Sequence, residues 1–279
     1  MQYRHLIIDG SYLAFSRFAV GSLPGGFLWE LVNLIDEYEP KAIFIAWDHP
    51  KGSERRKLVN PDYKFGRKKP DGYFEALCDL QHGLSLIGVC QVQSEEGEGD
   101  DVIATIARSF SGEKMIYTLD KDLYQLVSSD VHILRAKSKK IITPENIVEE
   151  TGLTAAQWVN YLILAGDNCD SIQGVKGIGD KRARDLIAAC PNIVELIIEE
   201  KSEKIIEAIS ENNVSLLKIA TRAINSLEDI LIAQDLIYLR NIRLDFFDAE
   251  CNSHAANKWL SNHELEYLIG RILITKEKF

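Results

Sequence analysis

Aspartates follow three short apolar runs in the first half of the chain. Asp9 comes after "LII", Asp48 after "IFIAW" and Asp120 after "MIYTL". Each run predicts a buried strand, and ligands of open parallel α/β sheets bind outside the carboxyl ends of the strands. A single aspartate in such a place is more often a helix cap or a turn residue. Three of them together predict one acidic edge.

Further carboxylates occur in closely spaced pairs: Asp120 and Asp122, Asp167 and Asp170, and Glu98 and Asp101. A spacing of two places side chains on one side of an extended backbone, and a spacing of three places them on one face of a helical turn. Crowded carboxylates repel and take up protons unless a cation neutralises them. Oxygen ligands suit Mg²⁺ or Mn²⁺ rather than zinc, and this many acids favours two ions, about 3.5–4 Å apart, for displacement at phosphate.

A basic segment and a glycine-rich turn offer cations and backbone N–H groups for phosphates. Residues 51–70 hold eight lysines and arginines against two acids, a local charge of +6 in a chain of net charge −10. Such a segment, which includes Tyr63, either binds DNA or is a solvated loop. The stretch "GVKGIGDKRARDLI" opens a predicted helix and lacks both the Rossmann and the Walker spacing. Its glycines favour close approach of the backbone to a phosphate without reading sequence.

The elements that must position these groups divide the chain in two. The first half predicts strands at 5–9, 42–48 and 114–120 and helices at 25–38 and 100–110, which is typical of an α/β layer architecture. The second half predicts helices at 154–166, 179–190, 192–209 and 262–274, with an extended stretch at 237–246. We expect a first domain over 1–152 and a second over 153–279.

Composition excludes several classes of protein. The chain has 279 residues, 46% of them hydrophobic and 27% charged, as in folded soluble domains. No apolar run reaches the roughly 20 residues that span a bilayer, and the start lacks a signal peptide, so we expect a cytoplasmic protein. Five scattered cysteines argue against a disulfide framework or a zinc site.

Seven ordered motifs between Leu6 and Leu186 resemble the structure-specific 5′ nucleases, a family that includes bacteriophage flap endonucleases and the 5′ nuclease domain of bacterial DNA polymerase I. The motifs are "IIDGS", "WD", "R-x4-P-x-YK-x2-R", "E-x-DD", "T-x-DKDLYQL", "GD-x2-D" and "GVKGIG". The resemblance implies a PIN-like, mainly parallel sheet flanked by helices, with a basic helical arch at about 50–72. It also implies a helical domain with a helix–three-turn–helix motif at about 166–190.

The resemblance further implies roles for individual residues. One divalent ion would be held at or near Asp9, Asp48, Glu98, Asp100 and Asp101, and a second by Asp120, Asp122, Asp167 and Asp170. Lys64 and Arg67 would grip the scissile phosphate or stabilise its developing charge, and Tyr63 would stack on a base. DNA contacts are implied for Arg56 in the arch and, with a bound K⁺, for Gly174, Lys176, Gly177, Gly179, Lys181 and Arg182. Where the family often reads "SDNIPG", this chain has Ser171 and Gln173.

The prediction is therefore a Mg²⁺-dependent flap endonuclease and 5′-3′ exonuclease that hydrolyses DNA at 5′ flaps, nicks and junctions by a two-metal mechanism. Mn²⁺ is expected to substitute for Mg²⁺. We expect a monomer; the sequence names no polymerase partner. A non-catalytic junction-binding protein would keep the basic segment and the glycine turn but has no use for nine acids. An aspartyl-phosphatase would favour a second acid two residues after Asp9, where this chain has Ser11.

Overall fold

The computed structural model describes residues 3–209 and 213–268, which form two compact units. The first unit holds 3–53, 68–143 and 239–268, and the second holds 54–67, 144–209 and 213–238. The division differs from the predicted boundary at 152/153 in three places. The second unit begins at 144 rather than 153. The basic segment 54–67 belongs to the second unit, and the chain after residue 238 returns to the first.

The first unit is built on a seven-stranded sheet in the order β6-β5-β4-β1-β2-β3-β9. Its strands are β1 (His5–Asp9), β2 (Ala42–Ala46), β3 (Cys90–Gln93), β4 (Lys114–Thr118), β5 (Val131–Arg135), β6 (Ile141–Ile142) and β9 (Asp245–Phe246). The five strands from β5 to β3 in this order are parallel to one another, and β6 and β9 pair antiparallel at the two edges. β1 and β4 are buried along their whole length, as expected of strands covered on both faces.

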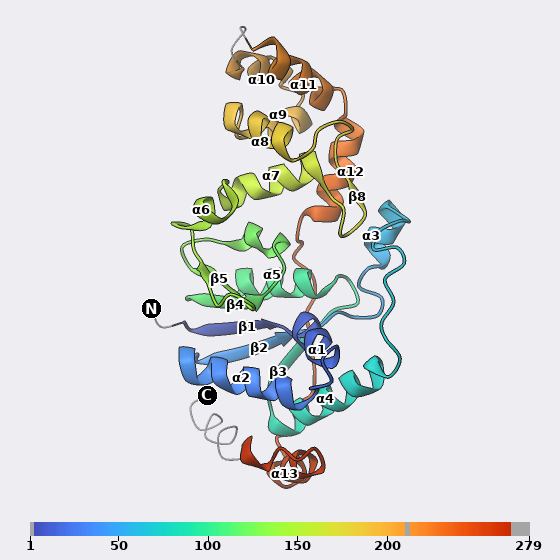
Figure 1. The fold of residues 1–279 in the computed structure, drawn as a ribbon, viewed down its shortest axis with the longest axis vertical. Coiled ribbons are helices and arrows are strands. Elements are labelled where there is room, and N and C mark those ends of the chain that lie inside the picture. The colour runs from blue at the N-terminus through green and yellow to red at the C-terminus, as the bar shows by residue number, and fades with distance from the viewer. Residues whose placement is uncertain (1–2, 210–212, 269–279) are drawn as a thin grey trace. The chain divides into compact units, whose positions relative to one another are not determined.

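Helices cover both faces of this sheet, with α5 on one face and α2 and α4 on the other (Figure 1). The helices of the unit are α1 (Gly10–Phe18), α2 (Gly25–Tyr38), α4 (Tyr73–Ile87), α5 (Gly99–Ser109) and α13 (Ser253–Asn262), with short 3-10 helices η1 (Asp122–Leu126) and η2 (Glu266–Leu268). α2 has the predicted bounds. Trp47 and Phe27, both fully buried, stack with ring centroids 5.9 Å apart in the core.

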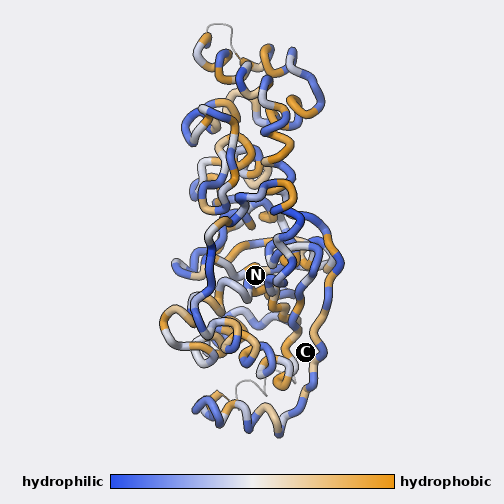
Figure 2. The backbone as a smooth tube through the Cα atoms, turned by 90° about the vertical axis from the view of Figure 1, so that its right-hand side faces the viewer, coloured by the Kyte–Doolittle hydropathy of each residue, from blue (hydrophilic) through white to orange (hydrophobic). Residues whose placement is uncertain are grey.

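The second unit is helical apart from one short hairpin. It contains α3 (Glu54–Val59), α6 (Ile147–Thr151), α7 (Ala155–Ala165), β7 (Gly166–Asp167), β8 (Ile172–Gln173), α8 (Asp180–Ala189), α9 (Ile193–Ile198), α10 (Ser202–Ala208), α11 (Val214–Ile224) and α12 (Leu227–Ile237). Hydrophobic and hydrophilic stretches alternate along these helices (Figure 2), which is the pattern of helices packed on one side.

Three predicted elements differ from the structure. The helix expected over 192–209 is broken into α9 and α10, because Glu200 adopts a left-handed φ of 56°. The stretch 237–246 forms a strand only at β9. The helix expected at 262–274 falls partly outside the described residues; within them, α13 ends at Asn262 and η2 spans Glu266–Leu268. No helix among the described residues is long and apolar enough to cross a membrane.

Candidate active site

The three strand-end aspartates meet at one edge of the first unit's sheet. β1 lies between β2 and β4 in the sheet and is parallel to both, so the carboxyl ends of the three strands lie side by side. Asp9 ends β1, Asp48 lies two residues after β2, and Asp120 two residues after β4. The predicted acidic edge is confirmed.

Asp9 is the buried centre of this edge, with only 8% of its surface exposed. One carboxylate oxygen accepts from the backbone N–H of Tyr12 at 2.9 Å and the other from the Thr118 hydroxyl at 2.8 Å. Burial, together with the charges of Asp48 and Asp120, raises the pKa of Asp9 to about 7 against the effect of these two hydrogen bonds. Such a group gains most from a neighbouring cation.

The N-terminus of α5 meets the same edge through Asp48. An oxygen of Asp48 accepts from the N–H of Gly99 at 2.8 Å, and the Asp48 N–H donates to the Ser11 hydroxyl at 2.8 Å. Asp100 lies in the first turn of α5, and Glu98, 7% exposed, is its N-cap. The helix dipole favours negative charge here. Four of the five acids predicted for the first ion, Asp9, Asp48, Glu98 and Asp100, are therefore brought to one region.

The fifth acid, Asp101, lies in the same first turn of α5 and also has a structural role. Its side chain is only 2% exposed, and its two oxygens accept from the backbone N–H groups of Glu98 at 3.2 Å and Arg240 at 3.0 Å. This arrangement closes a capping box at the start of α5 and attaches the chain after residue 238 to the first unit. Each Asp101 oxygen accepts one hydrogen bond, as each oxygen of Asp9 does, and the place of Asp101 at or near the first ion stays a prediction.

Asp120 and Asp122 follow β4 in a turn, so the condition under which the sequence places their side chains on one side, an extended backbone, is not met. The N–H of Asp122 donates to an oxygen of Asp120 at 2.8 Å, and η1 begins at Asp122. The backbone N–H of Asp120 donates to the Thr118 hydroxyl at 3.0 Å, which fixes the start of this turn. Among the described residues of the first unit, no three acidic side chains hold ligand oxygens all within 4.8 Å of one another.

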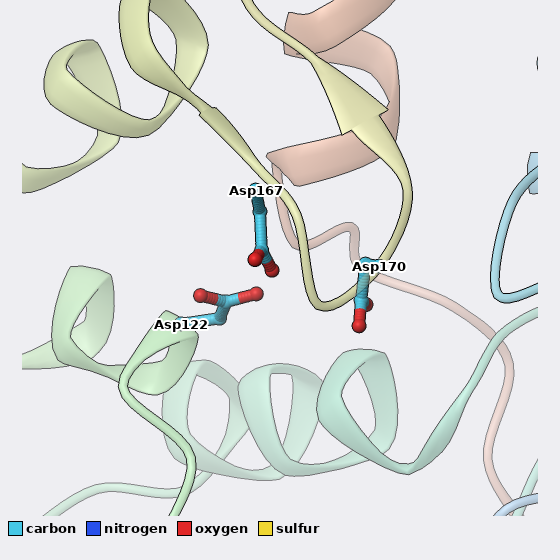
Figure 3. Close-up of side chains that lie close together, drawn as sticks. All are labelled: Asp122, Asp167 and Asp170. Atoms are coloured by element: carbon cyan, nitrogen blue, oxygen red, sulfur yellow. The ribbon is translucent and has the colours of Figure 1, made fainter. Parts of the chain in front are cut away.

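The second unit presents two more of the predicted metal ligands on the loop between β7 and β8. Asp167 and Asp170 are half-buried, and oxygens of the two side chains lie within 4.8 Å of each other. Their carboxylates project on the same side of the loop (Figure 3). An oxygen of Asp167 accepts from the N–H of Cys169 at 2.8 Å, which fixes the loop without a helical turn. Ser171 has a left-handed φ of 58°, so the replaced residue of the family motif holds the bend.

Basic residues of the segment 54–67 converge on Asp170. Arg67 donates to one of its oxygens at 2.5 Å, and the other lies 3.4 Å from Lys64 Nζ and accepts from the Tyr63 hydroxyl at 3.2 Å. Arg67 also donates to the carbonyl of Cys169 at 2.6 Å. The segment is thus folded onto the β7–β8 loop, which excludes the solvated-loop alternative for this part of it.

Arg56 and Tyr63 lie inside the second unit. Arg56 is 3% exposed and donates from Nε to the carbonyl of Leu236 at 2.9 Å, while Tyr63 is also 3% exposed. The guanidinium of Arg56 and the ammonium of Lys64 lie over the Tyr63 ring, at 5.9 and 5.1 Å from its centroid. The predicted DNA contact of Arg56 and base stacking of Tyr63 do not fit this arrangement, because neither side chain presents a free surface.

The glycine turn forms an open groove of about 1040 Å³ in the second unit. Residues 173–179 provide half of its lining, and Phe65, Asn168 and Asp229 are among the others. Gly177 has a φ of +80°, and Arg182 donates to its carbonyl at 2.6 Å. Among the described residues, no hydrogen bond is formed by the backbone N–H groups of Lys176, Gly177 and Gly179, and no ion pair by the side chains of Lys176 and Lys181. The turn therefore keeps donors and cations available to an anion.

Sequence reasoning missed the groups that orient the acids. Ser11 and Thr118 hydrogen-bond Asp48 and Asp9. Ser11 was considered only as a missing acid, although a hydroxyl beside a strand-end aspartate is a signal for such a contact. Arg222, from α11, a helix that the sequence did not predict, lies against the glycine turn.

A mainly parallel sheet with helices on both faces and acids at its carboxyl edge defines an α/β protein. Comparison with known proteins agrees with this geometry. The family model for the 5′-3′ exonuclease N-terminal, resolvase-like domain matches residues 4–152, and the chain belongs to this family.

Three similar proteins illustrate the relationship. The thermostable DNA polymerase I of Thermus thermophilus is 34% identical over 224 residues, covering 74% of this chain and 27% of the polymerase. The 5′-3′ exonuclease of Aquifex aeolicus is 34% identical over 166 residues, covering 58% and 57% of the two chains. The T5 protein co-crystallised with metal ions has the same fold, with a TM-score of 0.71 at 19% identity over 97% and 98% of the chains. The chain thus spans about a quarter of the length of the polymerases that it matches.

Proposed function

We propose that the protein is a divalent-metal-dependent nuclease that hydrolyses DNA phosphodiester bonds at 5′ flaps, nicks and single-strand/double-strand junctions. The observation that supports this most is the acidic edge, where the pKa of Asp9 is raised to about 7 by burial and by neighbouring carboxylates. A buried carboxylate with acidic neighbours, as Asp9 is, is costly to a protein unless a cation is bound. Membership of the 5′-3′ exonuclease family points to the same reaction.

The donor set fits a hard cation. The acids at the edge offer only carboxylate oxygens, which suit Mg²⁺, with Mn²⁺ as a substitute. We assign one ion to the acids Asp9, Asp48, Glu98, Asp100 and Asp101, which would lie at or near it. A second ion, assigned from sequence to Asp120, Asp122, Asp167 and Asp170, extends this proposal. Bound ions would lower the pKa of a water and neutralise charge on the departing 3′ oxygen.

The chain's own residues hold and orient the DNA in this proposal. Asp9 and Asp48 are kept in place by Thr118, Ser11 and the start of α5. Lys64 and Arg67 are the cations proposed for the scissile phosphate, where charge develops. Both now pair with Asp170, so neutralising that acid would free them to reach a phosphate. The glycine turn at 174–179 would hold the duplex through its N–H groups, with K⁺ as a proposed ligand there.

A cleavage assay tests the proposal directly. Purified protein with Mg²⁺ should cut a 5′-labelled flap substrate, and EDTA should stop cleavage while leaving binding detectable. Folded protein that binds the flap but never cuts it with Mg²⁺ or Mn²⁺ would identify a junction-binding protein instead. Asp48→Asn should lower the single-turnover rate by at least 100-fold with less than 10-fold loss of binding in Ca²⁺, since it removes a group acting on the transition state. Asp245→Asn, in the edge strand β9, is the matched control.

Substitutions of Asp170 and Lys64 distinguish a role in catalysis from a role in DNA binding. Asp170→Asn should slow cleavage more than it weakens binding, and an equal loss of both would count against its catalytic placement. Lys64→Ala should slow the single-turnover step and reduce the salt dependence of binding. An unchanged single-turnover rate would remove Lys64 from the reaction.

A further inference from the structure

α11 presents an exposed face of cations and polar groups. The exposed residues recur at helical spacing on one side, and the buried ones pack on the other. The exposed residues of α11 are Val214, Ser215, Lys218, Thr221 and Arg222, followed by Asn225 at the C-cap, and the buried ones are Leu216, Ala220 and Ala223. No acid occurs from residue 213 to residue 227, in a chain whose net charge is −10. This concentration of positive charge makes the face suited to an anionic partner.

Arg222 links this face to the glycine turn. A methyl group added at Gly177 would collide with Arg222 Nη1, and it would lie 3.4 Å from Cζ and 3.9 Å from Cδ. The guanidinium therefore rests against the backbone of the turn. Arg182 donates to the carbonyl of the same glycine at 2.6 Å. Two guanidinium groups thus flank Gly177, one from α8 and one from α11.

The two cations of α11 have no acidic partner in the part of the chain that the structure describes. Neither Lys218 nor Arg222 forms a side-chain hydrogen bond or ion pair there. Arg184, on the neighbouring α8, is instead neutralised by Asp180 at 2.8 Å. An exposed, unpaired arginine beside free backbone N–H groups is a site for a phosphate oxygen, because the guanidinium and the amides donate together.

We propose that Lys218 and Arg222 extend the duplex-binding surface of the glycine turn onto α11, each contacting a DNA backbone phosphate. This rests on the proposed function and names the residues that grip the double-stranded part of the substrate. Four residues of helix rise about 6 Å, and phosphates along one strand advance about 3.4 Å each, so the two cations match phosphates one or two steps apart. Contacts of this kind fix the register of the duplex without reading its sequence.

The test measures binding to DNA as a function of salt. Affinities for a 5′-flap substrate, for its duplex part alone and for its single-stranded flap alone would be measured with Ca²⁺ between about 50 and 400 mM KCl. Arg222→Gln and Lys218→Gln should each reduce the slope of log affinity against log salt by about 0.9 on the two duplex-containing ligands, and the double variant by about 1.8. Binding of the single strand should not change. Arg222→Lys should restore most of the slope, because it restores the charge.

A lysine elsewhere in the second unit provides the control for this test. Lys204→Gln, at an exposed lysine of α10, removes one charge away from the turn and should leave the slopes unchanged. The inference is overturned if Arg222→Gln keeps the parent slope, if Lys204→Gln lowers it equally, or if single-strand binding falls as much as duplex binding. Thermal unfolding checks that each variant is folded. A parent protein that neither binds nor cuts DNA refutes the proposed function, whereas a parent that cuts flaps while both glutamine variants bind normally refutes only this inference.

Discussion

Replacing Asp9 by asparagine should stabilise the metal-free protein at neutral pH. Burial raises the pKa of Asp9 from 3.8 to about 7. A shift of about 3 units, at 1.36 kcal/mol per unit, corresponds to about 4 kcal/mol that the folded state loses when this group ionises. Asparagine keeps an acceptor for the Tyr12 N–H and presents an N–H to the Thr118 hydroxyl. Allowing for imperfect hydrogen bonds of about 1 kcal/mol, we expect a gain of about 3 kcal/mol at pH 8.

The sign and range of the pH dependence follow from the same shift. Below about pH 4, Asp9 is protonated in both the folded and the unfolded chain, so the substitution changes little through charge. Between pH 4 and pH 7 the unfolded chain ionises first, and the parent loses stability as the pH rises. The free energy of unfolding of Asp9→Asn minus that of the parent should therefore grow by up to about 1.4 kcal/mol per pH unit and level off above pH 7.

Urea unfolding in EDTA at pH 5, 6, 7 and 8, followed by circular dichroism, measures this difference. Asp130→Asn is the control of opposite sign, because hydrogen bonding to Lys114 holds the pKa of Asp130 below its usual value. That variant should lose stability relative to the parent at neutral pH and approach it on acidification. With Mg²⁺ the parent should gain more stability than Asp9→Asn. A difference between Asp9→Asn and the parent that stays constant from pH 5 to pH 8 would refute the reasoning.

Three further perturbations test other parts of the structure. Burial acts to raise the pKa of Glu30, but hydrogen bonds from Lys139 and Tyr117 outweigh it and hold the pKa below the usual value. Glu30→Gln should therefore lower the free energy of unfolding at pH 7, and lower it less near pH 3. Urea unfolding at the two pH values measures this difference. Gly174→Ala would place a methyl group 2.5 Å from a main-chain carbonyl oxygen of α7, and should cost at least about 2 kcal/mol in unfolding free energy and weaken duplex binding. Arg56→Met leaves a buried carbonyl of α12 without this donor and should cost about 1–3 kcal/mol, whereas equal stability of variant and parent would contradict its role as an anchor of the basic segment.

The sequence predicted the first unit's central elements well. β1, β2 and β4 are continuous apolar runs closed by aspartates, and α2 has a clear helical period, so local pattern and tertiary packing agree. β3 and β5 were missed, since "CQVQ" and "VHILR" place polar residues on buried strands. Gln91 is fully buried because its side chain forms hydrogen bonds with Trp47 and Ser85. Trp47 is distant along the chain, and no periodicity of the sequence reveals either partner.

In the candidate site, too, some features follow from the sequence and others only from the folded chain. The sequence by itself determined which residue types end the strands and therefore which acids gather at the edge, because parallel strands bring their carboxyl ends together. Only the tertiary structure decided how each acid is used. Asp101 became a helix cap because two backbone N–H groups, one from residue 240, reach its oxygens. Arg56 and Tyr63 became interior residues because the segment 54–67 folds onto α12 and the β7–β8 loop. Contacts between residues more than a hundred positions apart leave no trace in local spacing, so their outcome depends on the folded chain.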